Sequence, residues 1–309
     1  MADAGEGQSD GRGASRPKGR WRGVVLVGLL LNALYILAYL ATGIDLYLPT
    51  LLILGVFLVP VAFVVYLVDR LPQDVIPLSV LAWCAFWSGI IAPLIAGPAL
   101  TGADLAFGAT LGWLGIGLIE ESIKLVVPLW FYFRGRYRSE AAGLLIGVSA
   151  GLGFAVMESM GYGLRAVLEA EDDIIGPLEA SLLVRALLSP AGHIAWTGII
   201  CAVLWRERER AGRATFNLKV LATFVVVILL HDLWDLGIFV GEGGPEELGL
   251  VTSSEVADLA GVGTLIAAIL SLVLFFYRLR EARRALAASA SEVLSGGPSA
   301  PTEGRPKTK

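Results

Sequence analysis

Long apolar stretches alternate with short polar loops along this chain, and the pattern predicts membrane-spanning helices. Eight stretches come close to or exceed the roughly 20 residues that a helix needs to cross the hydrocarbon core of a bilayer. They cover residues 24–41, 46–67, 76–95, 108–133, 142–167, 182–204, 218–240 and 259–277. We expect Pro93 and Pro98 to interrupt the third stretch, and the acidic loop 169–179 to hold a short interfacial helix. The sequence therefore predicts an all-α, polytopic transmembrane helical bundle of about eight spans.

Charged residues are distributed unequally between the two sets of loops. Basic residues precede the first span and follow the fourth, sixth and last spans: Arg20, Arg22, Arg134, Arg136, Arg138, Arg206, Arg208, Arg278 and Arg280. The intervening loops are acidic or neutral, as at residues 169–173 and 242–247. The positive-inside rule then places both termini in the cytoplasm, in agreement with an even number of spans.

Composition supports a membrane protein and sets its boundaries. The chain has 309 residues, of which 56% are hydrophobic and only 17% are charged, against about 25% charged residues in soluble domains. We expect a disordered cytoplasmic tail at residues 1–22, a membrane-embedded domain at 23–284 and a disordered cytoplasmic tail at 285–309. The abundance of Ala, Gly, Leu and Arg points to a bacterial source, and thus to a bacterial cell membrane.

The fourth span carries an unusual group of charges, Glu120-Glu121-Ser122-Ile123-Lys124. Each charge near a bilayer centre costs at least about 2.5–3.5 kcal/mol, so charges there need partners or a function. In a helix the spacing of three and four residues allows Lys124 to reach both Glu121 and Glu120. Ser122 points away from that stripe.

Further polar residues lie inside the next three spans: Glu158 in the fifth, His193 in the sixth, and His231 with Asp235 in the seventh. His231 and Asp235 are four residues apart and share one helical face. A rise of about 1.5 Å per residue puts these groups and Glu120 at similar depths in the membrane, roughly 10–20 Å from the outer ends of their spans. The sequence therefore predicts a polar site in which four helices converge.

Each of these residues also has a structural interpretation. A single membrane histidine such as His193 is more often an interhelical hydrogen-bonding residue than a ligand, and the Glu–Lys group could be a structural ion pair. We expect Asp232 to act as a packing or capping partner, and Arg185 to extend its charged end outward to the interface. The convergence of carboxylates, imidazoles and one lysine on four successive helices favours a functional site.

Two kinds of chemistry fit this set of side chains. A glutamate can take a proton from water while histidines orient the water or donate to a developing oxyanion. Alternatively, His193, His231 and Glu158 could hold a metal such as Zn²⁺, with Glu120 or Glu121 as the base. An HExxH motif is absent from the sequence, and the residues alone do not choose between the two schemes.

A second motif, Gly147-Val148-Ser149-Ala150-Gly151, matches the GxSxG pattern of serine hydrolases. That pattern needs a sharp turn between a strand and a helix, whereas this stretch lies in an apolar helical run. We therefore interpret it as a face of small residues for helix packing. A serine protease using Ser149 with His193 or His231 is the alternative, and it would leave the glutamates and Lys124 without a role.

Taken in order, these motifs resemble the PrsW family of intramembrane proteases, which is grouped with the type II CAAX prenyl endopeptidases. The similar patterns are EExxK at Glu120, Glu121 and Lys124, FxxxE at Phe154 and Glu158, a single histidine at His193, and HxxxD at His231 and Asp235. An early segment with Asp69-Arg70 and Pro77 is also similar, and the resemblance covers residues 56–277.

The resemblance implies an intramembrane endopeptidase whose substrates are membrane proteins, in some members an anti-sigma factor. Relatives have been described both as metal-dependent and as glutamate-dependent. We expect Glu120 or Glu121 to be the general base, with Glu158, His193 and His231 binding water, metal or the oxyanion, and with Lys124 and Asp235 in support. We expect contacts with lipid and no nucleic-acid partner. The alternatives are a non-catalytic scaffold or a proton-coupled transporter, although the sequence shows no internal repeat or matching broken helices.

Overall fold

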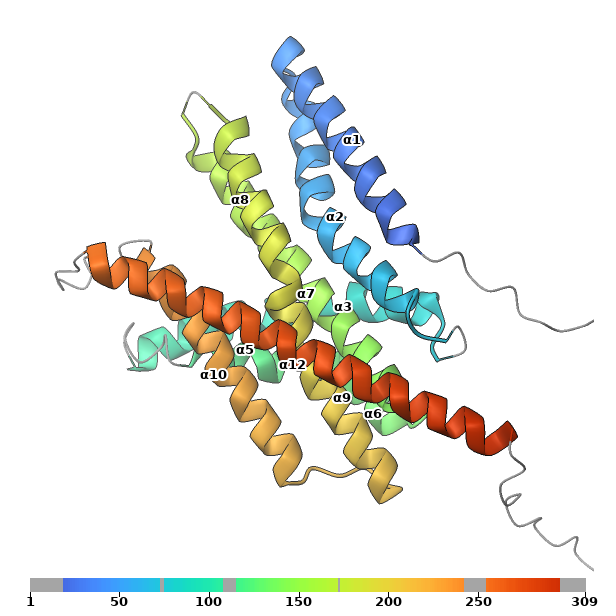
Figure 1. The fold of residues 1–309 in the computed structure, drawn as a ribbon. Helices are drawn as coiled ribbons and strands as arrows, with labels where there is room; N and C mark the ends of the chain where they lie inside the picture. Colours follow the sequence, from blue (N-terminus) through green and yellow to red (C-terminus); the bar gives the residue numbers. More distant parts are fainter. Residues whose placement is uncertain (1–18, 73–74, 108–114, 172, 242–253, 295–309) are drawn as a thin grey trace, which may run out of the picture.

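The computed structural model describes residues 19–72, 75–107, 115–171, 173–241 and 254–294, and these residues form helices without any strand (Figure 1). The elements are α1 (Arg20–Thr42), the 3₁₀ turn η1 (Asp45–Tyr47), α2 (Leu48–Val68), α3 (Leu78–Phe107), α5 (Ile116–Lys124), α6 (Val126–Arg134), α7 (Glu140–Glu169), α8 (Ile175–Leu188), the 3₁₀ turn η2 (Ser189–Ala191), α9 (His193–Ala211), α10 (Leu218–Gly241) and α12 (Ser254–Leu294). Within these ranges, seven helical segments are long and apolar enough to cross a membrane. The predicted all-α polytopic bundle is confirmed.

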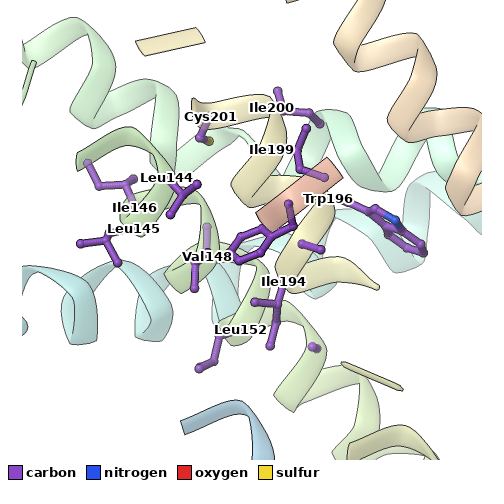
Figure 2. Packing of buried hydrophobic residues seen from close by; sticks show 14 of the residues in the cluster. Leu144, Leu145, Ile146, Val148, Leu152, Ile194, Trp196, Ile199, Ile200 and Cys201 are labelled. Carbon is purple, nitrogen blue, oxygen red and sulfur yellow. The ribbon is translucent and has the colours of Figure 1, made fainter. Parts of the chain in front are cut away.

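Helix α7 forms the centre of the bundle and packs most extensively against α9 (Figure 1). The most apolar part of α7 is 94% buried, whereas none of α1 is buried, so α1 lies at the periphery. Figure 2 shows buried residues of α7, such as Leu144 and Val148, and of α9, such as Ile194, that belong to one hydrophobic cluster. The core therefore lies around the two helices that carry Glu158 and His193.

Two glycines allow α7 and α9 to approach closely. A Cβ atom on Gly147 would collide with the backbone oxygen of Thr197, and one on Gly151 would collide with the backbone oxygen of His193. Small residues four apart are a common device for close helix contact in membranes. Ser149 lies between them in an uninterrupted, buried helix, and no hydrogen bond of the described residues joins it to a histidine. The packing interpretation of this motif therefore accounts for the structure.

The fourth predicted span differs from the continuous helix expected over residues 108–133. Residues 108–114 lie outside the described part, and the remainder consists of α5 and α6, which meet at Leu125. Pro128 explains the break, because proline has no N–H to donate to the carbonyl of Lys124 and its ring crowds that carbonyl. The break falls immediately after the Glu-Glu-Lys group.

The sixth predicted span, residues 182–204, is also interrupted. Helix α8 begins already at Ile175, in place of the short interfacial helix expected at 169–179, and ends at Leu188. The turn η2 and Gly192 (φ −96°, ψ −124°) then separate it from α9, so the break lies directly before His193. In contrast, α3 continues through both of its prolines to Phe107, where the sequence predicted an interruption.

The ends of the bundle also depart from the expected boundaries. Helix α12 continues to Leu294, past residue 285 where a tail was predicted; residues 1–18 and 295–309 lie outside the described part. The first turn of α1 is held by Asp69, which accepts hydrogen bonds from the backbone N–H groups of Gly19 (3.2 Å) and Arg20 (3.1 Å) and pairs with the Arg20 guanidinium (2.6 Å). Asp69 therefore caps a helix distant in sequence.

We predict that the α7–α9 contact limits the stability of the bundle. Gly147→Ala should lower the free energy of unfolding by about 1–3 kcal/mol, because the added methyl group overpacks the contact with the Thr197 backbone. Gly161→Ala on the same helix is the matched control: its Cβ would meet nothing within 4 Å, so it should be neutral or slightly stabilising. Unfolding midpoints in detergent measure both, and equal midpoints for the two variants would contradict this packing role.

Candidate functional site

The ammonium group of Lys124 lies at the centre of a buried polar cluster. Its Nζ atom donates to Glu121 Oε1 (2.8 Å) and Glu120 Oε2 (3.0 Å), and it lies 2.7 Å from His193 Nδ1. The ring of Phe154 lies beneath the ammonium, at 4.1 Å. Lys124 and Glu121 are completely or almost completely buried. The lysine therefore balances part of the negative charge of two carboxylates that are buried away from water.

The local sequence explains how α5 presents these three charges together. Positions 120, 121 and 124 share one face of the helix, as the spacing predicted. Ser122 lies on the exposed face and donates to the carbonyl of Leu118. Asp232 on α10 accepts a hydrogen bond from the N–H of Gly117 (3.1 Å), near the start of α5. Asp232 is thus the packing and capping partner that was expected, and it ties α10 to α5.

His193 is the first residue of α9, and the break in the helix places it within the cluster. Its two ring nitrogens face different groups: Nδ1 lies against the Lys124 ammonium, and Nε2 lies 2.8 Å from Glu158 Oε2 on α7. The close approach at Gly151 brings the backbone of His193 against α7 and so brings its ring within reach of Glu158. His193 therefore links Lys124 and Glu158, which lie on separate helices.

His231 on α10 completes the cluster from the opposite side. Its Nδ1 lies 3.0 Å from Glu121 Oε1, and its Nε2 lies 3.3 Å from Asp235 Oδ2 and 3.6 Å from Glu120 Oε2. The indole of Trp196 stacks on the imidazole with ring centres 4.5 Å apart. These contacts fix the plane of the His231 ring.

The stacking indole is itself held in place by α12. Its Nε1 atom donates a hydrogen bond to the hydroxyl of Ser271 (2.8 Å), and both residues are fully buried. A buried indole N–H normally requires such a partner. A residue on the last helix therefore supports the orientation of His231 through Trp196.

Arg185 on α8 is a member of the cluster that the sequence did not identify. We expected it to extend toward the interface, and that prediction is wrong: its guanidinium pairs with Glu158 Oε2 (2.7 Å) and donates to Ser159 Oγ (3.1 Å). It also lies over the ring of Tyr162, at 3.9 Å. The presence of an arginine inside a span, with a carboxylate on the neighbouring helix, was the available signal.

Exposure changes across the cluster. Glu121, Lys124 and His231 are buried, whereas the side chains of Glu158 and Asp235 are 24% and 20% exposed. Glu120 lies between these groups, with its side chain 9% exposed. The seven residues singled out from the sequence therefore lie together, with a buried side formed by Glu121, Lys124 and His231 and a more accessible side formed by Glu158 and Asp235.

The donor set fits a divalent metal ion. Among the described residues, Glu120, His193 and His231 each offer one ligand atom, and these atoms lie within 4.8 Å of one another. Two imidazoles and one carboxylate are the ligand types of several catalytic zinc sites. The carboxylate in this set of possible ligands is Glu120, whereas the sequence-based hypothesis assigned Glu158 to that position. The ammonium of Lys124 already places a positive charge beside two of these three side chains, His193 and Glu120.

We predict that Lys124 is required for folding stability. Lys124→Met should destabilise the protein by about 3–5 kcal/mol, because two buried carboxylates lose their counter-charge. Arg284→Met is the matched control, since Arg284 pairs with Glu281 at the same i,i+3 spacing on an exposed surface and should contribute about 0–1 kcal/mol. Thermal or denaturant unfolding in detergent provides the comparison; similar losses for both variants would contradict the role given to Lys124.

Comparisons with known proteins point to one family. The model of the PrsW family intramembrane metalloproteases matches residues 76–281, which include every residue of the cluster. Searches of curated proteins and of solved structures give no match. The matched segment covers about two thirds of the chain and runs from just before α3 into α12. The chain therefore belongs to the PrsW family of intramembrane metalloproteases and is a multi-pass membrane peptidase.

Proposed function

We propose that the cluster around Lys124 hydrolyses peptide bonds of membrane-protein substrates, with Glu120 as the general base that activates water. The observation that carries this proposal is the position of Glu120. Its carboxylate contacts Lys124 and lies near His231. It is also more accessible than the fully buried Glu121. A base must reach both a catalytic partner and the proton that it takes.

Glu121 and Asp235 orient His231 from its two sides. Glu121 Oε1 lies at Nδ1 and Asp235 Oδ2 lies near Nε2, while Trp196 restricts the ring plane. With Nδ1 held by Glu121, the Nε2–H would donate to the oxyanion that develops when water attacks an amide, in place of its contact with Asp235. The second oxygen of Glu121 is buried without a hydrogen-bond partner among the described residues. Such an atom is a natural partner for a bound water molecule.

Glu158, His193 and Arg185 form the more accessible side of the proposed site. Arg185 and His193 both contact Glu158 Oε2, so the carboxylate is held from two sides. In this arrangement Glu158 orients His193, and Arg185 is a positioning residue that connects α8 to the site. The substrate would be an extended segment of a transmembrane or juxtamembrane region, because a helical segment does not expose its amides.

A metal ion is compatible with the same residues. Glu120, His193 and His231 would hold it, and when bound it would supply Lewis acidity and lower the pKa of a bound water to about 7. Zn²⁺ is the ion we propose, on the basis of the ligand types. Under this scheme Glu120 would be a ligand, and the role of base would pass to Glu121, whose Oε1 lies 3.0 Å from His231 Nδ1.

The proposed function includes a substrate class and a cellular location. A membrane-protein substrate such as an anti-sigma factor, and a bacterial cell membrane as the location, are consistent with the family and the composition. The interrupted helices α5–α6 and α8–α9 are a feature shared with transporters, but both breaks border the Glu/His cluster and do not belong to a repeat visible in the sequence.

We predict that Glu120→Gln strongly reduces cleavage while the chain still folds, because the amide oxygen can still accept a hydrogen bond from Lys124. The substitution removes the base but keeps the shape of the side chain, so the rate should fall by about 10²–10⁴-fold. The assay is cleavage of a single-span membrane substrate by the purified protein in liposomes. Glu179→Gln on α8 is the matched control, because Glu179 lies outside the cluster and its hydrogen bond from Asn32 can be kept by an amide.

The same assay separates the roles of the two glutamates. Glu121→Gln should also reduce cleavage, through loss of the orientation of His231, and should in addition lower stability, because Lys124 loses a buried partner. Full activity of Glu120→Gln would exclude Glu120 as the base. Full activity of both variants, together with loss of cleavage in Ser149→Ala, would favour the serine scheme.

We predict that zinc retention depends most strongly on Glu120, His193 and His231 and less on Glu158, which would be an outer partner of His193. Purified variants are incubated with Zn²⁺, desalted and analysed for metal by mass spectrometry. Loss of a ligand, as in His193→Ala or Glu120→Gln, should weaken retention by more than the about 10–100-fold that loss of an outer partner costs. Equal zinc retention in all variants, or none in the wild type, would contradict the ligand set and leave water activation by glutamate alone.

A further inference from the structure

A cavity opens at the arginine-rich end of the bundle, outside the catalytic cluster. It has a volume of about 570 Å³ and lies between the first turns of α3, the last turn of α6 and the loop that follows α6. Its lining includes Trp83, Trp130, Phe131, Tyr137, Arg134 and Arg136. Cavities of about 300–1,000 Å³ are of the size that holds small molecules. Nothing in the proposed peptidase mechanism uses this cavity.

The walls of the cavity are aromatic. Trp83 and Trp130 stack with ring centres 5.3 Å apart, and Phe131 packs edge-on against both, at 5.6 Å and 4.9 Å. Trp83 is 43% exposed and Trp130 is 45% exposed, so neither indole is enclosed by the protein. Indole rings are typical of the membrane–water interface, where one side is apolar and the other is wet. This surface therefore has the composition typical of a membrane–water interface.

Two arginines lie at the rim of the aromatic cavity. The guanidinium of Arg134 lies over the Trp130 ring at 4.7 Å, and that of Arg136 lies over the Tyr137 ring at 5.5 Å. Neither arginine pairs with a carboxylate among the described residues, and both are exposed. Gly135 adopts φ +70°, which ends α6 and turns the chain so that both arginines line one cavity. The cavity thus combines apolar walls with two positive charges that lack counter-ions.

We propose that this cavity binds the phosphate headgroup of an anionic phospholipid, with the acyl chains lying along the exposed aromatic surface of α3 and α6. Charge complementarity carries the assignment: a phosphate ester accepts hydrogen bonds from a guanidinium in a bidentate manner, and basic pockets at the ends of membrane helices select anionic lipids. The exposed aromatic walls favour a ligand with an apolar part. A lipid therefore fits better than free phosphate or an acidic peptide.

The experiment compares lipid binding by the full chain and its variants, independently of protease activity. The purified protein is titrated in mixed micelles with phosphatidylglycerol or phosphatidylcholine, and bound lipid is counted by native mass spectrometry. The wild type should prefer phosphatidylglycerol, and the double variant Arg134→Gln/Arg136→Gln should bind it about tenfold more weakly. Arg138→Gln is the matched control, because Arg138 lies in the same loop, donates to the Gly135 carbonyl and does not line the cavity.

A second pair of variants tests the cavity without removing an arginine. Ser79 lines the cavity and is exposed, so Ser79→Glu should weaken phosphatidylglycerol binding through charge repulsion, whereas Ser79→Gln should not. Equal binding of the two lipids by the wild type, or unchanged binding by the double arginine variant, would overturn the proposal. Displacement of the bound lipid by inorganic phosphate or by an acidic peptide at similar concentration would overturn the assignment to a lipid.

Discussion

The ammonium group of Lys124 is the interaction on which the rest of the site depends. Two carboxylates, Glu120 and Glu121, sit in a part of the bundle from which water is largely excluded, and without a counter-charge each would carry a large desolvation cost. Because the same ammonium also lies against His193 Nδ1, it couples α5 to α9. Through Glu121 the coupling extends to His231 on α10. The contacts of a single charge, direct and through Glu121, therefore connect α5, α9 and α10.

Close helix packing supplies the rigid frame for this arrangement. The glycines of α7 let α9 approach until its backbone touches theirs, and the break before His193 then directs that side chain toward Glu158. On the other side, Trp196 and Ser271 hold the plane of His231. Helices α7 and α9 are closely packed against each other, whereas the side chains of Glu158 and Asp235 are partly exposed. A site of this kind can hold reacting groups firmly and still admit a substrate from one side.

Much of the site could be predicted from the sequence because it depends on helical spacing. The contacts of Lys124 with Glu120 and Glu121, and of His231 with Asp235, follow from the three- and four-residue periodicity alone. To predict that α5, α7, α9 and α10 converge, it was enough to estimate how deep each polar residue lies in the membrane. Periodicity does not show which faces of separate helices meet, so the pairing of Arg185 with Glu158, and the place of Glu120 among the possible metal ligands, became visible only in the structure. The helix breaks had local signals, Pro128 and Pro190 with Gly192, but similar prolines in α3 do not break that helix.

The most direct test of this account is a measurement of the surroundings of the Lys124 ammonium. In liposomes, solid-state NMR on protein with ¹⁵N-labelled lysine and ¹³C-labelled glutamate and histidine reports dipolar couplings between Lys Nζ and nearby carbon atoms, and Lys124→Met identifies the signal. We predict a single lysine Nζ coupled to carboxyl carbons and to an imidazole ring at once, with both couplings lost in Lys124→Met. A Lys124 signal without coupling to a carboxyl carbon or to a histidine ring would contradict the account.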